Sequence, residues 1–236
     1  MVVAPGGIPV TLPYAGKPFV FMNGDMAQFL PLFPLSLIVF PGEELRLHIF
    51  EPRYRQLIQD CIDSDLTFGI PAVMENDLGN IATEVQLVSV DKRYAEGRMD
   101  ITTRGMRRAR MLEYFQQTPG KLYPGGQVQW LESDEQPDPA LQRDVFQLIE
   151  SLHDALGVTK KFADDPEGIR AFLIGHHIGL NLKQEYALLT LDSEIDRLRF
   201  VVEHLQNILP VVMETERLKA KAKLNGHYKN MIPPDF

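Results

Sequence analysis

A run of prolines and apolar residues near the N-terminus constrains the fold more than any other part of the sequence. Residues 29–55 read FLPLFPLSLIVFPGEELRLHIFEPRYR, with prolines at 31, 34 and 41. Because proline fixes φ and has no amide proton, it occurs at strand starts, edges and turns more than inside a sheet. We therefore expect an edge strand at about residues 35–40 and a turn at 41–42. A second strand at 45–49 and a helix that begins at Pro52 should follow.

The remainder of the first half has the pattern of one helix followed by short strands. Residues 51–65 repeat apolar residues at helical spacing, and Cys61 lies inside this apolar stripe. Beyond them, apolar residues alternate with polar ones, which is typical of half-buried strands. We expect a turn at 76–80, a bend or bulge at Gly105, and strands at 68–75, 81–93, 98–103, 107–115 and 126–131. Five or more short strands with one early helix predict a small, mostly antiparallel barrel.

The second half has helical spacing and follows an acidic, proline-bearing segment, residues 132–139, which we interpret as a linker. Asp138 followed by Pro139 is a helix-start signal, and Gly157 is a stop signal. The remaining helices are expected at three places: after Asp165 and Pro166, at residues 183–189, and from Ser193 onward. Pro210 should kink or interrupt the last of them. The pattern predicts a four-helix bundle.

Composition narrows the possible function classes. The 236 residues are 44% hydrophobic and 24% charged, as in an ordinary globular protein, and the net charge of −8 disfavours a general nucleic-acid coat. The single cysteine excludes an internal disulfide framework and a thiolate zinc cluster built from this chain. No apolar run approaches the roughly 18–20 residues of a membrane span, and residues 1–25 lack a signal-peptide pattern. We therefore expect a cytoplasmic protein with no membrane contact.

Positive charge is concentrated in residues 92–110 despite the acidic total. Only Glu96 and Asp100 oppose seven basic residues there: Lys92, Arg93, Arg98, Arg104, Arg107, Arg108 and Arg110. Arginines at alternating strand positions can form a cationic face that holds phosphates or an acidic peptide. They can equally pair with residues 132–236, which hold 18 acidic and 12 basic residues. Both roles fit this pattern.

The motifs of common enzyme classes are missing from the sequence. It contains no G-x-x-x-x-G-K-[ST], G-x-S-x-G, H-E-x-x-H or glycine-rich dinucleotide fingerprint. The adjacent His176 and His177 would project about 100° apart on a helix, so we expect one half-buried and one exposed histidine instead of a metal site. Cys61, on an apolar stripe without a nearby base, is expected in the core. We predict a protein with no enzymatic activity, cofactor or metal.

Three segments resemble the Lon N-terminal domain, the substrate-binding module that precedes the ATPase in Lon proteases. Residues 30–35, 39–42 and 45–55 resemble the pattern LPLFPL–VFPG–LxLHIFEPRYR of stand-alone bacterial relatives. Residues 98–110 resemble the family's central hairpin with its Gly-x-x-Arg-x-Arg element, and DSEIDRLRFVVEHLQNIL resembles its first long helix. The resemblance covers roughly residues 28–220. It implies an α+β fold, in which a PUA-like antiparallel β pseudo-barrel with one inserted helix is followed by a C-terminal α-helical bundle.

The resemblance and the residue pattern together suggest a division of the chain. We expect a weakly packed N-terminal extension (1–26), a barrel (27–131), a linker (132–139), a helical bundle (140–225) and a tail (226–236). In a Lon protease the Ser–Lys dyad lies in a separate C-terminal domain, and this chain ends about where the ATPase would begin. We therefore expect no peptidase activity here.

Two binding hypotheses remain. The first is a non-catalytic module that holds unfolded polypeptide or exposed hydrophobic segments of other proteins, because large apolar residues are dense near the predicted strand ends and turns. Its candidate contacts are Phe33, Phe40, Phe50, Tyr54, Arg104, Arg107 and Arg108, although each aromatic residue is individually more typical of a core. The alternative is RNA binding through the basic hairpin 92–110, since PUA-like barrels elsewhere bind RNA. The acidic total and the lack of RNP-like elements disfavour it. The sequence does not specify the oligomeric state.

Overall fold

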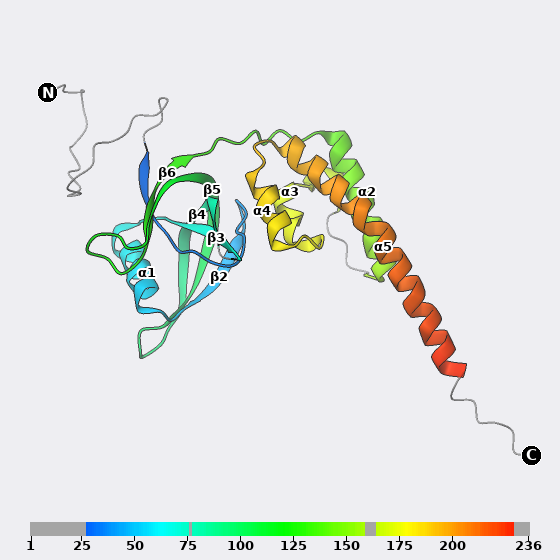
Figure 1. The fold of residues 1–236 in the computed structure, drawn as a ribbon, viewed down its shortest axis with the longest axis horizontal. Helices are drawn as coiled ribbons and strands as arrows, with labels where there is room; N and C mark the ends of the chain where they lie inside the picture. Colours follow the sequence, from blue (N-terminus) through cyan, green and yellow to red (C-terminus); the bar gives the residue numbers. More distant parts are fainter. Residues whose placement is uncertain (1–26, 76, 159–163, 229–236) are drawn as a thin grey trace, which may run out of the picture.

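The computed structural model describes residues 27–75, 77–158 and 164–228. The expected N-terminal extension, residues 1–26, and residues 229–236 of the expected tail lie outside the described residues. A twisted sheet with one short helix forms one part of the protein, and the other helices lie together on the opposite side of that sheet (Figure 1). Within the described ranges, none of the helices combines the length and the apolarity needed to cross a membrane.

The sheet has six strands and is antiparallel, in the order β1-β6-β5-β4-β3, with β2 also paired to β5. Its elements are β1 (Gln28–Pro31), β2 (Glu44–Ile49), β3 (Phe68–Met74), β4 (Asp77–Arg93), β5 (Met99–Phe115) and β6 (Gly125–Trp130), with helix α1 (Pro52–Ser64) after β2. No continuous ladder closes the sheet. Isolated parallel bridges at Leu32–Gly69 and Leu35–Ala72 instead join the segment after β1 to β3. The predicted α+β class with a mostly antiparallel sheet and one early helix is confirmed, and the described strands leave the expected pseudo-barrel open.

The predicted strand at residues 35–40 is wrong, because this segment is irregular. Its apolar side chains are nevertheless buried, with Val39 1% and Phe40 0% exposed. Side chains satisfy its backbone in place of a ladder: Thr83 Oγ1 donates to the Val39 carbonyl, and the Phe40 amide donates to Glu43 Oε2 at 2.8 Å. The apolar run therefore indicated burial, and the prolines around it prevented strand pairing.

The two strands predicted around Gly105 are one long strand, β5, with an irregular register at the glycine. Thr83 pairs with Arg108 whereas Val85 pairs with Gly105, so β5 holds one extra residue at this point, as expected for a bulge. The predicted turn at 41–42 packs against β5 at Gly105. The Gly42 amide donates to the Gly105 carbonyl at 2.9 Å. A Cβ at Gly105 would lie 2.3 Å from the Phe40 carbonyl oxygen, so only glycine permits this approach. Of the predicted turn at 76–80, residues 77–80 belong instead to β4, which starts at Asp77, and residue 76 lies outside the described residues.

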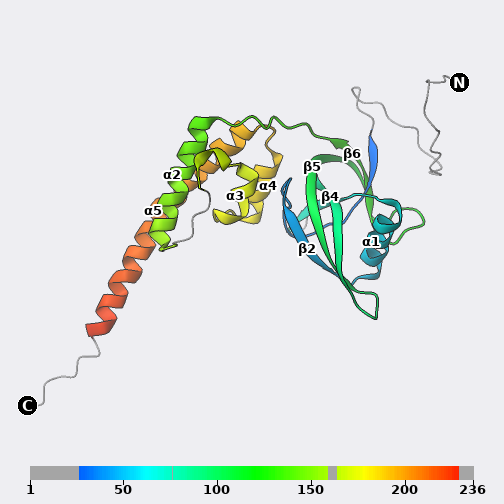
Figure 2. The ribbon, with the colours of Figure 1, turned by 180° about the vertical axis from the view of Figure 1, so that it is seen from behind.

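Helix α1 covers the side of the sheet that faces away from the other helices (Figures 1 and 2). Pro52 occupies its first turn, and Asp65 ends it in a left-handed conformation. Its buried face, including Tyr54 and Cys61, packs into a core with Phe33 and other apolar residues of the sheet. The rings of Phe33 and Tyr54 stack with centroids 3.8 Å apart.

The helices of the second half start and stop near the expected signals, but only two are long. They are α2 (Pro139–Leu156), α3 (Ala171–Ile174), α4 (Leu182–Thr190) and α5 (Glu194–Tyr228), with 3₁₀ turns at Pro166–Gly168 and Gly175–His177. Asp138 caps α2 by accepting from the Ala140 amide, and Gly157 ends it with a φ of +67°. The start signal at Asp165 gives a 3₁₀ turn followed by the single turn of α3, because Gly168 and Gly175 leave a short helical run.

Of the two effects predicted for Pro210, an interruption of the last helix is wrong, since α5 continues to Tyr228, and a kink stays a prediction. Proline removes one helical hydrogen bond, to the carbonyl of Gln206. Both Pro210 and Gln206 are exposed, so water can satisfy that carbonyl. The helix beyond Pro210 extends past α2 and away from the rest of the protein (Figure 2).

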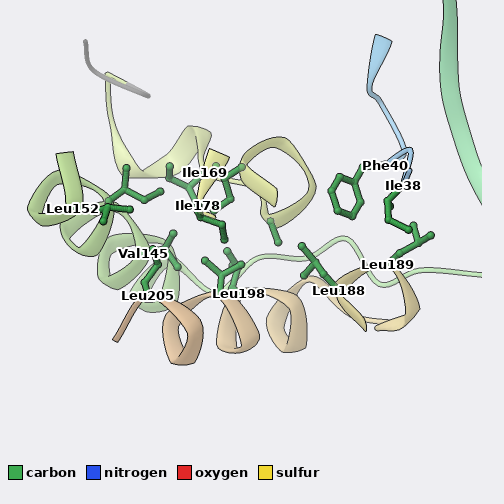
Figure 3. Packing of buried hydrophobic residues seen from close by; sticks show 14 of the residues in the cluster. Ile38, Phe40, Val145, Leu152, Ile169, Ile178, Leu188, Leu189, Leu198 and Leu205 are labelled. Atoms are coloured by element: carbon green, nitrogen blue, oxygen red, sulfur yellow. The ribbon is translucent and has the colours of Figure 1, made fainter. Parts of the chain in front are cut away.

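The sheet and the helices share one apolar core, which we call the junction core. Ile38, Phe40, Ala72 and Ile81 of the first half are buried with residues of α2, α3, α4 and α5. Ile38 and Phe40 face the end of α4 at Leu188 and Leu189 (Figure 3). The rings of Phe40 and Phe172 stack with centroids 5.1 Å apart. The domain boundaries expected from the sequence stay a prediction, and this core shows that the two halves are packed together.

Candidate functional site

Three of the four aromatic residues predicted to contact a ligand are inside the protein. Phe33, Phe40 and Tyr54 are 6%, 0% and 4% exposed. Phe33 and Tyr54 belong to the core under α1, and Phe40 belongs to the junction core. Because they present no surface, their role in this structure is packing.

Phe50 differs from the other three predicted aromatic residues because it is 60% exposed. It follows β2 and precedes α1, where the chain reverses direction. Its ring lies beside the ring of His48, with centroids 6.2 Å apart. Tyr94 lies next to His48 at 5.8 Å, and the ammonium of Lys92 lies 4.5 Å from the Tyr94 ring centroid. Phe50 thus belongs to an exposed aromatic and cationic rim on the β2 side.

Arg108 is structural, because only 2% of it is exposed and its guanidinium joins the two halves. It donates to the carbonyls of Leu189 and Leu191 at 2.9 and 2.8 Å. It also pairs with Asp192 at 3.1 Å. Burial lowers the pKa of Arg108, and the charge of Arg197 nearby lowers it further. For this residue the salt-bridging role expected from the sequence applies.

Arg104 and Arg107 are exposed but paired within the sheet. Arg104 pairs with Glu44, and Arg107 Nε donates to Glu84 Oε2 at 2.7 Å. The guanidinium of Arg107 also lies 3.7 Å from the ring centroid of Trp130. With Arg98 and Arg108, four of the seven basic residues of 92–110 are therefore paired with carboxylates of the protein. This arrangement gives the RNA alternative no support.

An open depression lies between α1, the β4–β5 hairpin and the loop before β6. Its volume is about 460 Å³. We call it the hairpin depression, and it is lined by Pro52, Arg55, Gln56, Gln59, Arg93, Gly97, Met99 and Leu122. Leu122 is 53% exposed and forms its apolar edge on the side of the loop.

Hydrogen bonds hold the three walls of the hairpin depression together. Arg55 Nη1 donates to the Glu96 carbonyl at 2.6 Å, which joins α1 to the hairpin. Gly97 turns the hairpin with a φ of +84°, and a Cβ there would lie 3.0 Å from Arg55 Nη1. On the other side, the Leu122 amide donates to Gln56 Oε1 at 2.7 Å. The depression is therefore formed before any ligand arrives.

Asp60 fastens the loop that carries Leu122 to the body of α1. Its Oδ2 accepts from Lys121 Nζ and from the Tyr123 hydroxyl, both at 2.7 Å. Burial raises the pKa of Tyr123, and the hydrogen bond to Asp60 raises it further. Tyr123 therefore stays protonated and continues to donate over the physiological pH range.

The two arginines of the hairpin depression lack the acidic partners that their neighbours have. Arg53 pairs with Glu51, and Arg98 pairs with Glu96. Among the described residues, no carboxylate oxygen lies within 4.0 Å of Arg55 or Arg93. Arg93 Nη1 reaches only the side-chain oxygen of Gln59, at 3.4 Å. The depression therefore presents positive charge that the protein has not neutralised.

The remaining candidates from the sequence have structural places. His176 lies between Glu185 of α4 at 2.7 Å and Glu43 of the first half at 3.1 Å. The hydrogen bond to Glu43 raises the pKa of His176 to about 9. Cys61 is buried, and desolvation raises its pKa to about 12. In the part of the chain that the structure describes, no group of three or more His, Cys, Asp or Glu side chains could hold a metal ion.

Comparison with known proteins gives one consistent result. Residues 29–207 match the family model described as the ATP-dependent protease La (LON) substrate-binding domain. A crystal structure of a Lon N-terminal domain protein from Xanthomonas campestris has a TM-score of 0.59 and 26% identity, covering 75% of this chain and 98% of that one. The N-terminal domain of the Mycobacterium avium complex Lon protease has a TM-score of 0.58 and 18% identity, covering 76% and 98%, and at this identity it shows the fold alone. Comparison with curated proteins gave no match.

Proposed function

The chain belongs to the Lon substrate-binding domain family, and from this premise we propose that it is a non-catalytic module that holds polypeptide segments with exposed hydrophobic residues. The observation that carries the proposal is the exposure of two apolar side chains: Leu122 lines the hairpin depression, and Phe50 lies two residues before Pro52, another lining residue. Its partners are other proteins, in unfolded or partly unfolded form. We include a cytoplasmic location in the proposal, because a chain with one cysteine suits a reducing compartment.

The apolar side chains supply the expected driving force. Phe50 and Leu122 are 60% and 53% exposed, so each leaves most of its apolar surface in water. Covering a Phe or Leu side chain fully gains about 1.5–3 kcal/mol. Isolated exposed apolar residues need no explanation, but Leu122 lines a depression that could receive a side chain, and Phe50 lies two residues before Pro52 of the same lining.

The lining of the hairpin depression suits binding more than chemistry. Its polar side chains are two arginines and two glutamines, and its other members are Pro52, Gly97, Met99 and Leu122. Glutamine amides can both donate to and accept from a peptide backbone. This lining contains no Ser, Thr or Cys nucleophile, no histidine and no carboxylate, which are the side chains that peptide hydrolysis uses. The site can therefore hold a segment without cleaving it.

The proposal is tested by the binding of a permanently unfolded probe, reduced and carboxymethylated α-lactalbumin, followed by fluorescence anisotropy. We expect Phe50→Ser and Leu122→Ser each to weaken binding about 3- to 10-fold, because each removes apolar area from the contact. Leu173→Ser is the matched control. Leu173 is 55% exposed but lies in α3, on the other side of the sheet from α1 (Figure 1).

Leu173→Ser should leave the affinity unchanged. Equal losses in all three variants, or no loss in any, would contradict the assignment of the site. Absence of binding by the unmodified protein would contradict the function itself.

A further inference from the structure

We propose that the hairpin depression selects an acidic side chain within the bound segment, flanked by apolar residues. The inference rests on the proposed function and names the kind of segment that the site prefers. It arises from the contrast between an acidic protein, with a net charge of −8, and a depression in which Arg55 and Arg93 lack carboxylate partners in the described part of the chain.

Nearby acidic residues do not neutralise these two arginines, because their carboxylates already have other partners. Glu96 pairs with Arg98, and Glu51 pairs with Arg53. Asp100 accepts from the Tyr94 hydroxyl at 2.8 Å and lies 2.6 Å from His48 Nδ1. The hydrogen bond with His48 lowers the pKa of Asp100. The positive charge in the depression is therefore available to a ligand.

A carboxylate is the ligand group that this geometry fits. Arginine donates in a planar fork that matches a carboxylate, and such charge-assisted hydrogen bonds are stronger than neutral ones. Arg55 also donates to the Glu96 carbonyl at 2.6 Å, which fixes its side chain before binding. Preorganisation of this kind lowers the entropic cost of binding.

The open form of the depression favours an acidic side chain over a free chain terminus. A segment that crosses the depression places residues on both sides of the carboxylate. Pro52 and Leu122 lie within the lining, and exposed Phe50 lies two residues before Pro52. Apolar residues on either side of the acidic one would cover these surfaces. The preferred sequence is therefore an acidic residue between large apolar residues.

The test uses fluorescein-labelled heptapeptides with acetylated and amidated ends, in which a central Glu, Gln or Lys lies between two leucines. We expect the Glu peptide to bind about 3- to 10-fold more tightly than the Gln peptide at low salt. Raising the ionic strength to 0.5 M should reduce the preference. A fourth peptide has the Gln sequence and a free C-terminal carboxylate, and it should bind no better than its amidated form.

Charge variants locate the effect. Arg93→Gln should remove most of the preference for Glu, and Arg93→Glu should reverse it in favour of the Lys peptide. Arg110→Gln is the matched control, because Arg110 is an exposed arginine of β5 that also lacks a carboxylate within ion-pair distance among the described residues, and it does not line the depression. It should leave the preference unchanged.

The outcomes separate this inference from the function on which it rests. Equal binding of the Glu and Gln peptides, with Phe50→Ser still weakening both, would overturn the selectivity and leave the proposed function standing. A preference that Arg93→Gln and Arg110→Gln reduce equally would also overturn it, because the effect would then be general electrostatics. Tighter binding of the free-carboxylate peptide would assign the site to chain termini and overturn it as well. If no peptide binds and the unfolded probe does not bind, both proposals fail.

Discussion

Arginines on the two sides of the sheet have different surroundings. On the helical side, Arg108 and Arg197 are 2% and 0% exposed, and their donors are satisfied by carbonyls and carboxylates of the protein. On the α1 side, Arg55 and Arg93 line an open depression without an acidic partner among the described residues. A buried arginine must be satisfied internally, because an unpaired buried charge is very costly. The first pair therefore maintains the fold, and the second pair is available for binding.

Two phenylalanines differ in the same way, one buried and one exposed, and they give the prediction with the largest effect on the free energy of unfolding. Phe40 is fully buried in the junction core, whereas Phe50 is 60% exposed between β2 and α1. Phe40→Ala should lower the free energy of unfolding by about 3–5 kcal/mol, because it leaves a cavity between the sheet and the helices. Phe50→Ala should change it by less than about 0.5 kcal/mol. Urea denaturation followed by circular dichroism measures both, and similar losses would show that the two sides do not differ in this way.

The sequence predicted the elements better than it predicted which residues are accessible. The helix at Pro52, the turn at 41–42 and the bend at Gly105 were recognisable because proline and glycine restrict the backbone locally. The apolar run 35–40 was mistaken for a strand, because a buried irregular segment and a buried strand share the same composition.

The candidate site was less predictable than the fold for a physical reason. The sequence does not distinguish the four aromatic candidates of residues 29–55 from one another. Long-range packing buries Phe33, Phe40 and Tyr54 and leaves Phe50 exposed. The hairpin depression brings α1, the hairpin and the loop at Leu122 together from distant parts of the chain. No local periodicity encodes such contacts. The pairing of His176 with Glu43, 133 residues away, was missed for the same reason.

The prediction of intermediate size concerns the helical side of the sheet, where the free energy of unfolding should depend on pH through His176. The pKa of His176 is raised to about 9 in the folded protein, chiefly by its hydrogen bond to Glu43 and then by Glu185, against an opposing effect of burial. The unfolded value is about 6.5. The raised pKa means that the folded state holds the proton more tightly. The stabilisation is therefore fully present below pH 6.5 and is lost as the pH rises through about 9.

His176→Gln tests this assignment by removing the titrating group. At pH 6 the substitution should lower the free energy of unfolding by about 1–2 kcal/mol, a figure reduced for solvent screening of a partly exposed side chain. At pH 9.5 most of this difference should have disappeared. His153→Gln is the control, since His153 lies near the end of α2 and should show little change. A difference that is the same at both pH values would show that His176 acts through packing alone.

Gly97→Ala should have a smaller effect on stability than Phe40→Ala, and it tests the α1 side directly. Gly97 and Gly157 both have a positive φ, so replacing either with alanine should lower the free energy of unfolding by about 1 kcal/mol. Of the two, Gly97 is the one that lies close to a side chain of the hairpin depression. A Cβ added at Gly97 would lie 3.0 Å from Arg55 Nη1, whereas a Cβ added at Gly157 would have nothing within 4 Å. Gly97→Ala should therefore weaken binding of the Glu peptide and Gly157→Ala should not, as measured by anisotropy on variants of equal stability. If both bind like the unmodified protein, the position of Arg55 does not control binding, and the difference between the two sides would then concern stability alone.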